Sequence, residues 1–198
     1  TRRDMALTTA IYDRCPVLFD KSGDEGVAAW PVKYTTMFHM TNDSHLFRTR
    51  AELEDKESAW PIGGNRWQSS GGEWVPLYEG KMLQAFDHRA ASVVVNYDNL
   101  HRPGQPRETT LDEHTNSDFA IAPQYWLAWD SLPSEGKRPY VLTYKRIGAP
   151  TNFRTFIAAM GPAAGYEVNA NVIVPEDASD ASTHALILGC VNSLPFDF

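Results

Sequence analysis

The sequence predicts an α+β fold: a mostly antiparallel, twisted sheet with a few flanking helices and long loops. Short runs rich in β-branched and aromatic residues recur along the chain, and glycine- or proline-containing loops separate several of them. Helical patterns are fewer. The predicted strands are residues 33–40, 74–78, 82–86, 92–97, 125–129, 140–146, 155–160 and 171–174.

Helical signals lie near the two ends of the chain and around residue 50. Thr49 and Glu52 have the spacing of a capping box, in which each side chain accepts from the other residue's backbone N–H. Residues 4–14 place their apolar side chains on one face of an amphipathic helix. Residues 182–198 resemble a capped helix that runs into further apolar residues, so we expect the chain to be a piece of a longer protein.

Composition is that of a folded globular protein. The chain has 198 residues, of which 42% are hydrophobic and 12% aromatic, so we expect residues 1–198 to form a single domain. The sequence has no apolar run of the roughly 20 residues needed to span a bilayer and no signal-peptide pattern, which favours a cytoplasmic protein without membrane contact. Cys15 and Cys190 lack metal-site spacing, and we expect both to be buried, reduced thiols.

The charge distribution is uneven. A net charge of −7 opposes binding to a phosphate backbone. Residues 133–174, however, carry five basic side chains against two acidic ones, whereas residues 108–130 and 176–198 carry acids and no lysine or arginine. A basic face on an acidic body is compatible with DNA binding, and a solvated run of charges is the alternative interpretation.

Few residues have the spacing of a catalytic site. The sequence lacks a phosphate-binding glycine-rich loop and a GxSxG turn, so we predict no catalytic residue. His39, Asp43 and His45 have a spacing that suits a metal-dependent hydrolase, although a polar turn explains them as well. Residues 87–89 and 112–114 resemble acid–base pairs, but neighbours on a strand point to opposite faces. We interpret the tryptophans as core or loop anchors before base-stacking platforms.

Several sequence blocks, taken in order, span nearly the whole chain. They are Phe38-His-Met-Thr-Asn-Asp-Ser-His-Leu-Phe47, Pro76-Leu-Tyr-Glu-Gly-Lys-Met82 with Phe86-Asp-His-Arg89, Gln124-Tyr-Trp-Leu-Ala-Trp129, Tyr144-Lys-Arg-Ile147, Arg154-Thr-Phe-Ile-Ala-Ala-Met-Gly-Pro162 and Leu188-Gly-Cys-Val-Asn-Ser-Leu194. Together they resemble the target-recognition region that follows the catalytic domain in Eco57I-like N6-adenine DNA methyltransferases. Such enzymes belong to restriction-modification systems and to phage-defence systems such as DISARM.

The resemblance implies a division of labour. The catalytic domain of the same parent chain would extrude an adenine and methylate it with S-adenosylmethionine. The present chain lacks the Asn-Pro-Pro-Tyr type of motif and the cofactor loop of that domain, so the resemblance implies no cofactor in this piece. Its partners would be double-stranded DNA, read in the major groove, and the catalytic domain itself. A protein-interaction module of a defence complex is the alternative, and it would explain the acidity.

Seven residues are candidate DNA contacts under this resemblance. We expect Gly80 to form a tight turn that presents Lys81 to solvent, where its ammonium meets a phosphate. Arg146 and Arg154 lie at strand ends and have the geometry to grip a phosphate or a guanine, with a structural salt bridge as the alternative for each. The full set is Tyr78, Gly80, Lys81, Arg89, Lys145, Arg146 and Arg154.

Overall fold

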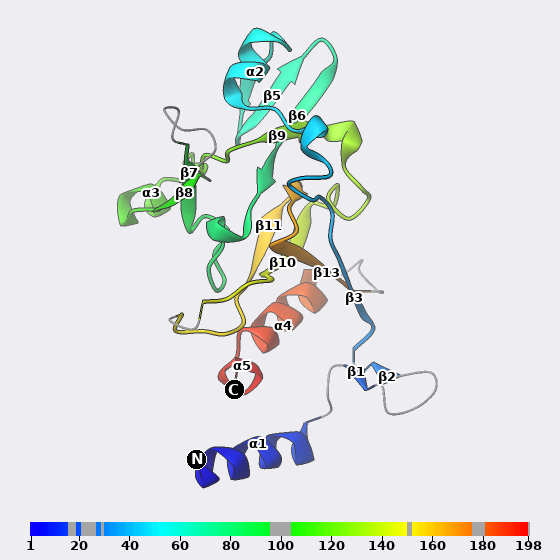
Figure 1. Cartoon of the computed structure of the whole chain (residues 1–198), viewed down its shortest axis with the longest axis vertical. Helices are drawn as coiled ribbons and strands as arrows, with labels where there is room; N and C mark the ends of the chain where they lie inside the picture. The colour runs from blue at the N-terminus through cyan, green and yellow to red at the C-terminus, as the bar shows by residue number, and fades with distance from the viewer. Residues whose placement is uncertain are drawn as a thin grey trace.

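A computed structural model describes residues 1–15, 19–20, 27–28, 30–95, 104–149, 152–175 and 181–197 (Figure 1). It confirms the α+β class, because helices flank strands that pair mostly antiparallel. The end of the predicted strand 92–97 lies outside the described residues. Within the described part of the chain, no helix is long and apolar enough to cross a membrane.

The helices are short apart from the first and fourth. They are α1 (Arg2–Arg14), α2 (Arg50–Asp55), α3 (Leu111–Thr115), α4 (Ala181–Val191) and α5 (Leu194–Asp197), with 3-10 turns η1 (Ser44–Leu46), η2 (Gly80–Met82) and η3 (Trp129–Ser131). The strands are β1 (Phe19–Asp20), β2 (Val27–Ala28), β3 (Val32–Thr35), β4 (Trp60–Gly63), β5 (Arg66–Ser69), β6 (Gly72–Tyr78), β7 (Ala91–Val94), β8 (Gln105–Glu108), β9 (Trp126–Ala128), β10 (Tyr140–Lys145), β11 (Ala158–Pro162), β12 (Gly165–Tyr166) and β13 (Ala170–Pro175).

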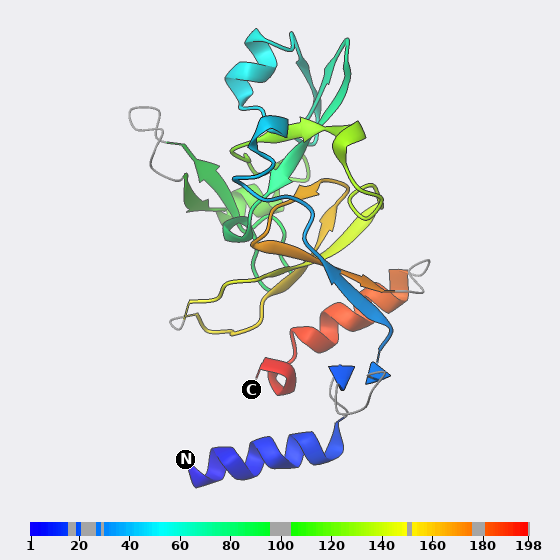
Figure 2. The same cartoon turned by 45° about the vertical axis from the view of Figure 1, so that its right-hand side comes forward.

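A four-stranded antiparallel sheet, in the order β11-β10-β13-β3, has both faces covered (Figure 2). Leu142 and Ile173 pack against Ile187 of α4 on one face. Val141 and Val172 belong to the cluster on the opposite face, as the alternation of side chains along a strand requires. Burying each of these aliphatic side chains stabilises the fold by roughly 1.5–3 kcal/mol.

The second sheet has the order β12-β6-β5-β4, with β9 also paired to β6. Trp67, Trp74 and Trp126 are buried there against Leu53 of α2, which confirms the interpretation of these tryptophans as core anchors. Its one parallel pair joins β12 to the end of β6. Through that pair the second sheet meets the turn that leads into β13, where the Glu167 N–H donates to the Tyr78 carbonyl at 2.9 Å.

Strand β4 forms the outer edge of this second sheet. All of its residues are exposed, and its pairing with β5 shifts register between Pro61 and Gly63. Trp60 is 53% exposed at the start of the strand. The edge is therefore irregular and carries an apolar side chain on the surface.

Two local predictions are wrong. Residues 82–86 do not form a strand, because Met82 ends the turn η2 and Leu83, the next residue, is also fully buried. The chain turns at η2 and again between Gln84 and Asp87, so these residues cannot extend into a strand. Cys15 is exposed just after α1, a helix without buried residues, and Cys190 is only partly buried. The other predicted strands each overlap an observed one.

The capping box at the start of α2 is confirmed. Thr49 Oγ1 accepts from the Glu52 N–H at 3.3 Å, and Glu52 Oε2 accepts from the Thr49 N–H at 3.0 Å. Lys56 Nζ lies 2.8 Å from Glu52 Oε1. The hydrogen bond from Lys56 and that from the Thr49 backbone lower the pKa of Glu52 from 4.5 to about 2.

Replacing Glu52 with glutamine is expected to lower stability at pH 7 by about 0.5–1 kcal/mol, a value discounted for the exposure of the pair. Because the folded-state pKa lies below the unfolded one, the carboxylate stabilises the fold above pH 4.5 and loses this effect as the pH falls towards 2. Thermal denaturation at pH 7 and pH 2.5 should therefore show a difference that shrinks in acid. Glu54→Gln, on the same helix but outside the box, is the control; an undiminished Glu52→Gln difference in acid would contradict the assignment.

Candidate nucleic-acid interface

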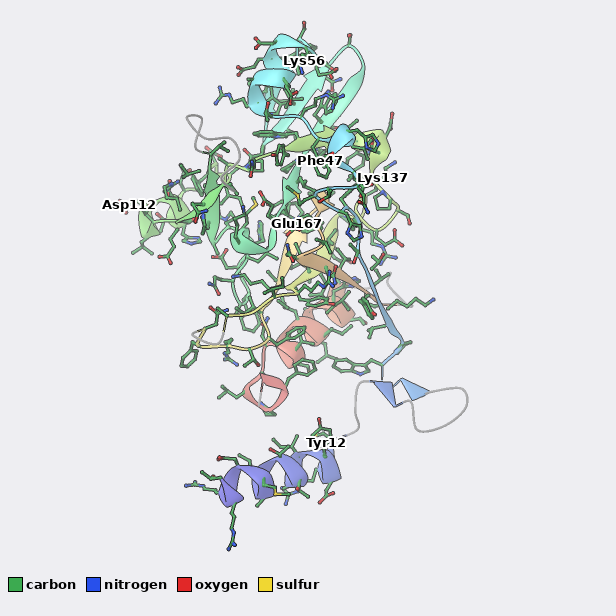
Figure 3. All side chains as sticks on the ribbon, in the orientation of Figure 1. Tyr12, Phe47, Lys56, Asp112, Lys137 and Glu167 are labelled. Atoms are coloured by element: carbon green, nitrogen blue, oxygen red, sulfur yellow. The ribbon has the colours of Figure 1, made fainter. Side chains whose placement is uncertain are left out.

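The turn before β13 gathers two of the predicted residues. The Gly80 N–H donates to Glu167 Oε1 at 3.0 Å, and a Cβ on Gly80 would lie 2.5 Å from the Asn169 carbonyl oxygen. That same carbonyl accepts from the Arg146 N–H at 3.0 Å. Glu167 lies in the middle of the molecule (Figure 3). Residue 80 is therefore a glycine because the backbone of η2 approaches the backbone of Asn169 too closely for a Cβ. The Asn169 carbonyl also fixes Arg146, the first residue after β10.

Tyr78 and Gly80 are core residues in this structure. Tyr78 is only 5% exposed and its ring stacks on Tyr166, with centroids 5.2 Å apart. Burial raises the pKa of the Tyr78 phenol, so the hydroxyl stays protonated. Both residues therefore hold the end of β6 in place.

The prediction that Lys81 stands on an exposed tip is wrong. Its side chain is 24% exposed, and Nζ lies 2.7 Å from Glu79 Oε2 and donates to the Gly104 carbonyl at 2.8 Å. Burial raises the pKa of Glu79, and Lys81 opposes this shift while Glu167 adds to it. Glu79 Oε1 is buried without a hydrogen-bond partner among the described residues. The ammonium therefore neutralises a buried carboxylate.

Arg89 holds the end of α3. Its Nη2 donates to the His114 carbonyl at 3.1 Å, and its Nη1 donates to the Phe119 carbonyl at 3.2 Å. A guanidinium suits this position because carbonyls at a helix end lack backbone donors. Like Lys81, Arg89 is engaged within the fold.

The acid–base pair that forms joins the two segments 87–89 and 112–114, not neighbours within either one. Asp87 Oδ2 lies 3.4 Å from His114 Nε2, and both side chains are about one-third exposed. His88 is more deeply placed, and burial is the main cause that lowers its pKa. Asp87 and His88 thus face different surroundings. The spacing of residues in the sequence does not indicate the Asp87–His114 pair.

The proposed metal ligands form a polar turn. Asp43 Oδ2 accepts from the His39 N–H at 2.7 Å, which commits one carboxylate oxygen to the backbone. Across the described ranges, no three histidine, cysteine, aspartate or glutamate side chains come close enough together to hold a metal ion. This hydrogen bond therefore supports the interpretation of His39, Asp43 and His45 as a polar turn.

The segment that follows β10 carries the remaining predicted cations. Arg146 is exposed, and its side chain has no ion pair or hydrogen bond within the described part of the chain. Arg154 Nη1 donates to the Asn192 carbonyl at 3.0 Å, and its guanidinium lies 6.0 Å from the centre of the Phe153 ring. Lys145 is partly buried, which lowers its pKa. Residues 145–157 contain no acid, so this segment is a local concentration of positive charge.

Two phenylalanines are exposed, one on this segment and one on a turn that is hydrogen-bonded to the start of β11. Phe153 is 93% exposed, and Phe86 is 58% exposed at the corner of the turn that follows η2. The Phe86 N–H donates to the Ala158 carbonyl at 2.9 Å, which ties this turn to the start of β11. Both views place the turn beside the segment that joins β10 to β11 (Figures 1 and 2). We call Phe86, Arg146, Phe153 and Arg154 the cationic–aromatic surface.

Asn192 links Arg154 of this surface to the start of β11. Its buried side chain accepts from the Ala158 N–H at 3.0 Å and donates to the Ala158 carbonyl at 2.9 Å, so it completes the outer edge of β11. Sequence reasoning identified neither this role nor the exposure of Phe86. Both residues lie in the blocks quoted above, but their contacts join positions far apart in the chain. The positions of Asn192 and Phe86 in the sequence therefore do not indicate these contacts.

No family model matches the sequence, and no curated protein is significantly similar to it.

Proposed function

We propose that this chain is the DNA target-recognition part of a site-specific N6-adenine DNA methyltransferase of restriction-modification or phage-defence type. One observation carries the proposal: in the acid-free segment 145–157, Arg146 is exposed without a side-chain partner among the described residues, and Arg154 lies beside the exposed ring of Phe153. Cations interleaved with aromatic side chains are the pattern of a nucleic-acid surface. The ordered sequence blocks supply the class of parent enzyme.

The proposal takes residues 1–198 as one recognition domain in a bacterial, cytoplasmic enzyme. Arg146 grips a phosphate, or a guanine through its two parallel N–H groups. Arg154 adds positive charge while it holds the Asn192 carbonyl. The catalytic domain of the parent supplies S-adenosylmethionine and extrudes the adenine. Because the chain carries a net charge of −7, attraction to DNA is local to this surface and binding by the chain alone is weak.

Replacing Arg146 with alanine is expected to weaken duplex binding and to flatten the slope of log affinity against log salt by about one unit, since one phosphate contact is lost. Fluorescence anisotropy with labelled duplexes across a salt series measures both quantities. The control is Arg50→Ala, which removes an arginine paired to Glu54 on α2, a helix that lies well away from the β10–β11 segment (Figure 1). It should leave the slope unchanged.

The same titration separates the alternative function. A slope near zero for the intact chain would overturn the DNA proposal and favour a protein-interaction module, which the net charge of −7 also suits. Equal slopes for wild type, Arg146→Ala and Arg50→Ala, with DNA still bound, would move the interface away from the cationic–aromatic surface.

A further inference from the structure

Phe86 has a backbone conformation that aromatic residues seldom adopt. Its φ is +64°, in the left-handed region. The Gln84 N–H donates to the Asp87 carbonyl at 2.8 Å and the Asp87 N–H donates to the Gln84 carbonyl at 2.9 Å, so Ala85 and Phe86 form the corner of a tight turn. A side chain larger than glycine costs about 1–2 kcal/mol in this region. Glycine would fit the corner without that cost.

Burial of the ring does not offset this strain. Phe86 is 58% exposed as a residue, whereas its backbone N–H is anchored to the Ala158 carbonyl at 2.9 Å. Asp87 Oδ1 also accepts from the Arg89 N–H at 2.7 Å, which fixes the far side of the turn. A firmly held backbone thus presents a ring to solvent. Strain of this kind gathers at functional sites, where the surrounding structure maintains it.

The neighbours of the ring indicate what it contacts. Asn192 joins Phe86 to Arg154, because its side chain shares the Ala158 carbonyl with Phe86 while its own carbonyl accepts from Arg154. Phe153, beside Arg154, exposes a second ring. An exposed, flat apolar ring suits a nucleobase face, and the arginines of the segment that leads into β11 suit neighbouring phosphates.

We propose that Phe86 is a wedge that stacks on nucleobases of the bound duplex and opens one base step. This inference rests on the proposed function and adds to it the residue that deforms the DNA. The hydrogen-bonded turn fixes the backbone that carries the ring before DNA arrives, so little backbone freedom is lost when the ring enters the stack. Arg146 and Arg154 hold the backbone on either side of the opened step.

Phe86→Gly tests the wedge separately from the fold. Glycine relieves the left-handed strain, so the melting temperature should stay the same or rise. The dissociation constant for duplex DNA should increase by roughly 5- to 100-fold, the range for loss of one stacked base. Duplexes with 2-aminopurine at successive positions should brighten at one position with the wild-type chain and not with Phe86→Gly. Trp60→Ala, which removes an exposed aromatic ring from β4, should change neither signal.

Two conservative variants distinguish stacking from general apolar contact. Phe86→Trp should keep the 2-aminopurine signal, and Phe86→Leu should lose most of it. If Phe86→Gly binds like wild type while Arg146→Ala binds more weakly, the wedge is wrong and the DNA function stands. Should Phe86→Gly lose binding together with melting temperature, or should Phe86→Leu match wild type, the ring is structural. Absence of any DNA binding by the wild-type chain overturns both proposals.

Discussion

Replacing Gly80 with alanine is expected to lower the free energy of unfolding by about 3 kcal/mol, the upper part of the range for overpacking a core. The new Cβ would lie 2.5 Å from the Asn169 carbonyl oxygen, which is backbone and cannot rotate away. Relief requires η2 to move from the turn before β13. That movement also weakens the hydrogen bond from the Gly80 N–H to Glu167 Oε1. Chemical denaturation measures the loss.

Gly189→Ala is the matched control, with an effect of opposite sign. Gly189 lies in α4, and a Cβ there would meet no atom within 4 Å. Alanine should therefore stabilise the chain by about 0.5–1 kcal/mol through its higher helix propensity. If Gly80→Ala were neutral or stabilising like Gly189→Ala, the close approach of η2 to Asn169 would be incorrect.

Asn192→Ala is expected to destabilise the chain by about 2–4 kcal/mol, combining an unsatisfied buried donor with one lost hydrogen bond. The Ala158 N–H would lose its acceptor, Asn192 Oδ1, inside the protein. The Ala158 carbonyl would keep only the Phe86 N–H as a donor. The melting temperature should fall, and hydrogen exchange should speed up at Ala158.

Substitutions at and beside this position test the cause. Asn192→Asp keeps the acceptor for the Ala158 N–H but loses the donor to the Ala158 carbonyl, so it should fall between wild type and Asn192→Ala. Ser193→Ala changes the next residue and should leave stability within about 0.5 kcal/mol. Equal losses for Asn192→Ala and Ser193→Ala would mean that helix packing, not the link to β11, sets the stability.

Local pattern predicted most of the fold and missed specific strands for physical reasons. Runs dense in β-formers between turn residues predict β6 and β13, which are buried along most of their length, and β10, which is half buried. The hairpin of β4 and β5 was missed, since Pro61 and the glycines after it have the composition of a loop. Strand β8 was missed because all four of its residues are exposed and mostly polar.

The candidate site was less predictable than the fold. Charge alone predicts Arg146 and Arg154, which lie on the cationic–aromatic surface, whereas the glycine before Lys81 wrongly predicts that this lysine points into solvent. The partners that turn Lys81 inward are Glu79 and the Gly104 carbonyl, and the second lies 23 positions away. Side-chain direction depends on such tertiary contacts, which residue spacing does not contain.

The irregular edge at β4 bears on self-association. An open sheet edge normally offers a row of N–H and carbonyl groups to which another chain can add a strand. Proline at position 61 has no N–H, and the register shift before Gly63 bends the edge, so an incoming strand finds an interrupted ladder. Trp60 can thus remain on the surface while its own strand discourages fibril-like stacking of copies at high concentration.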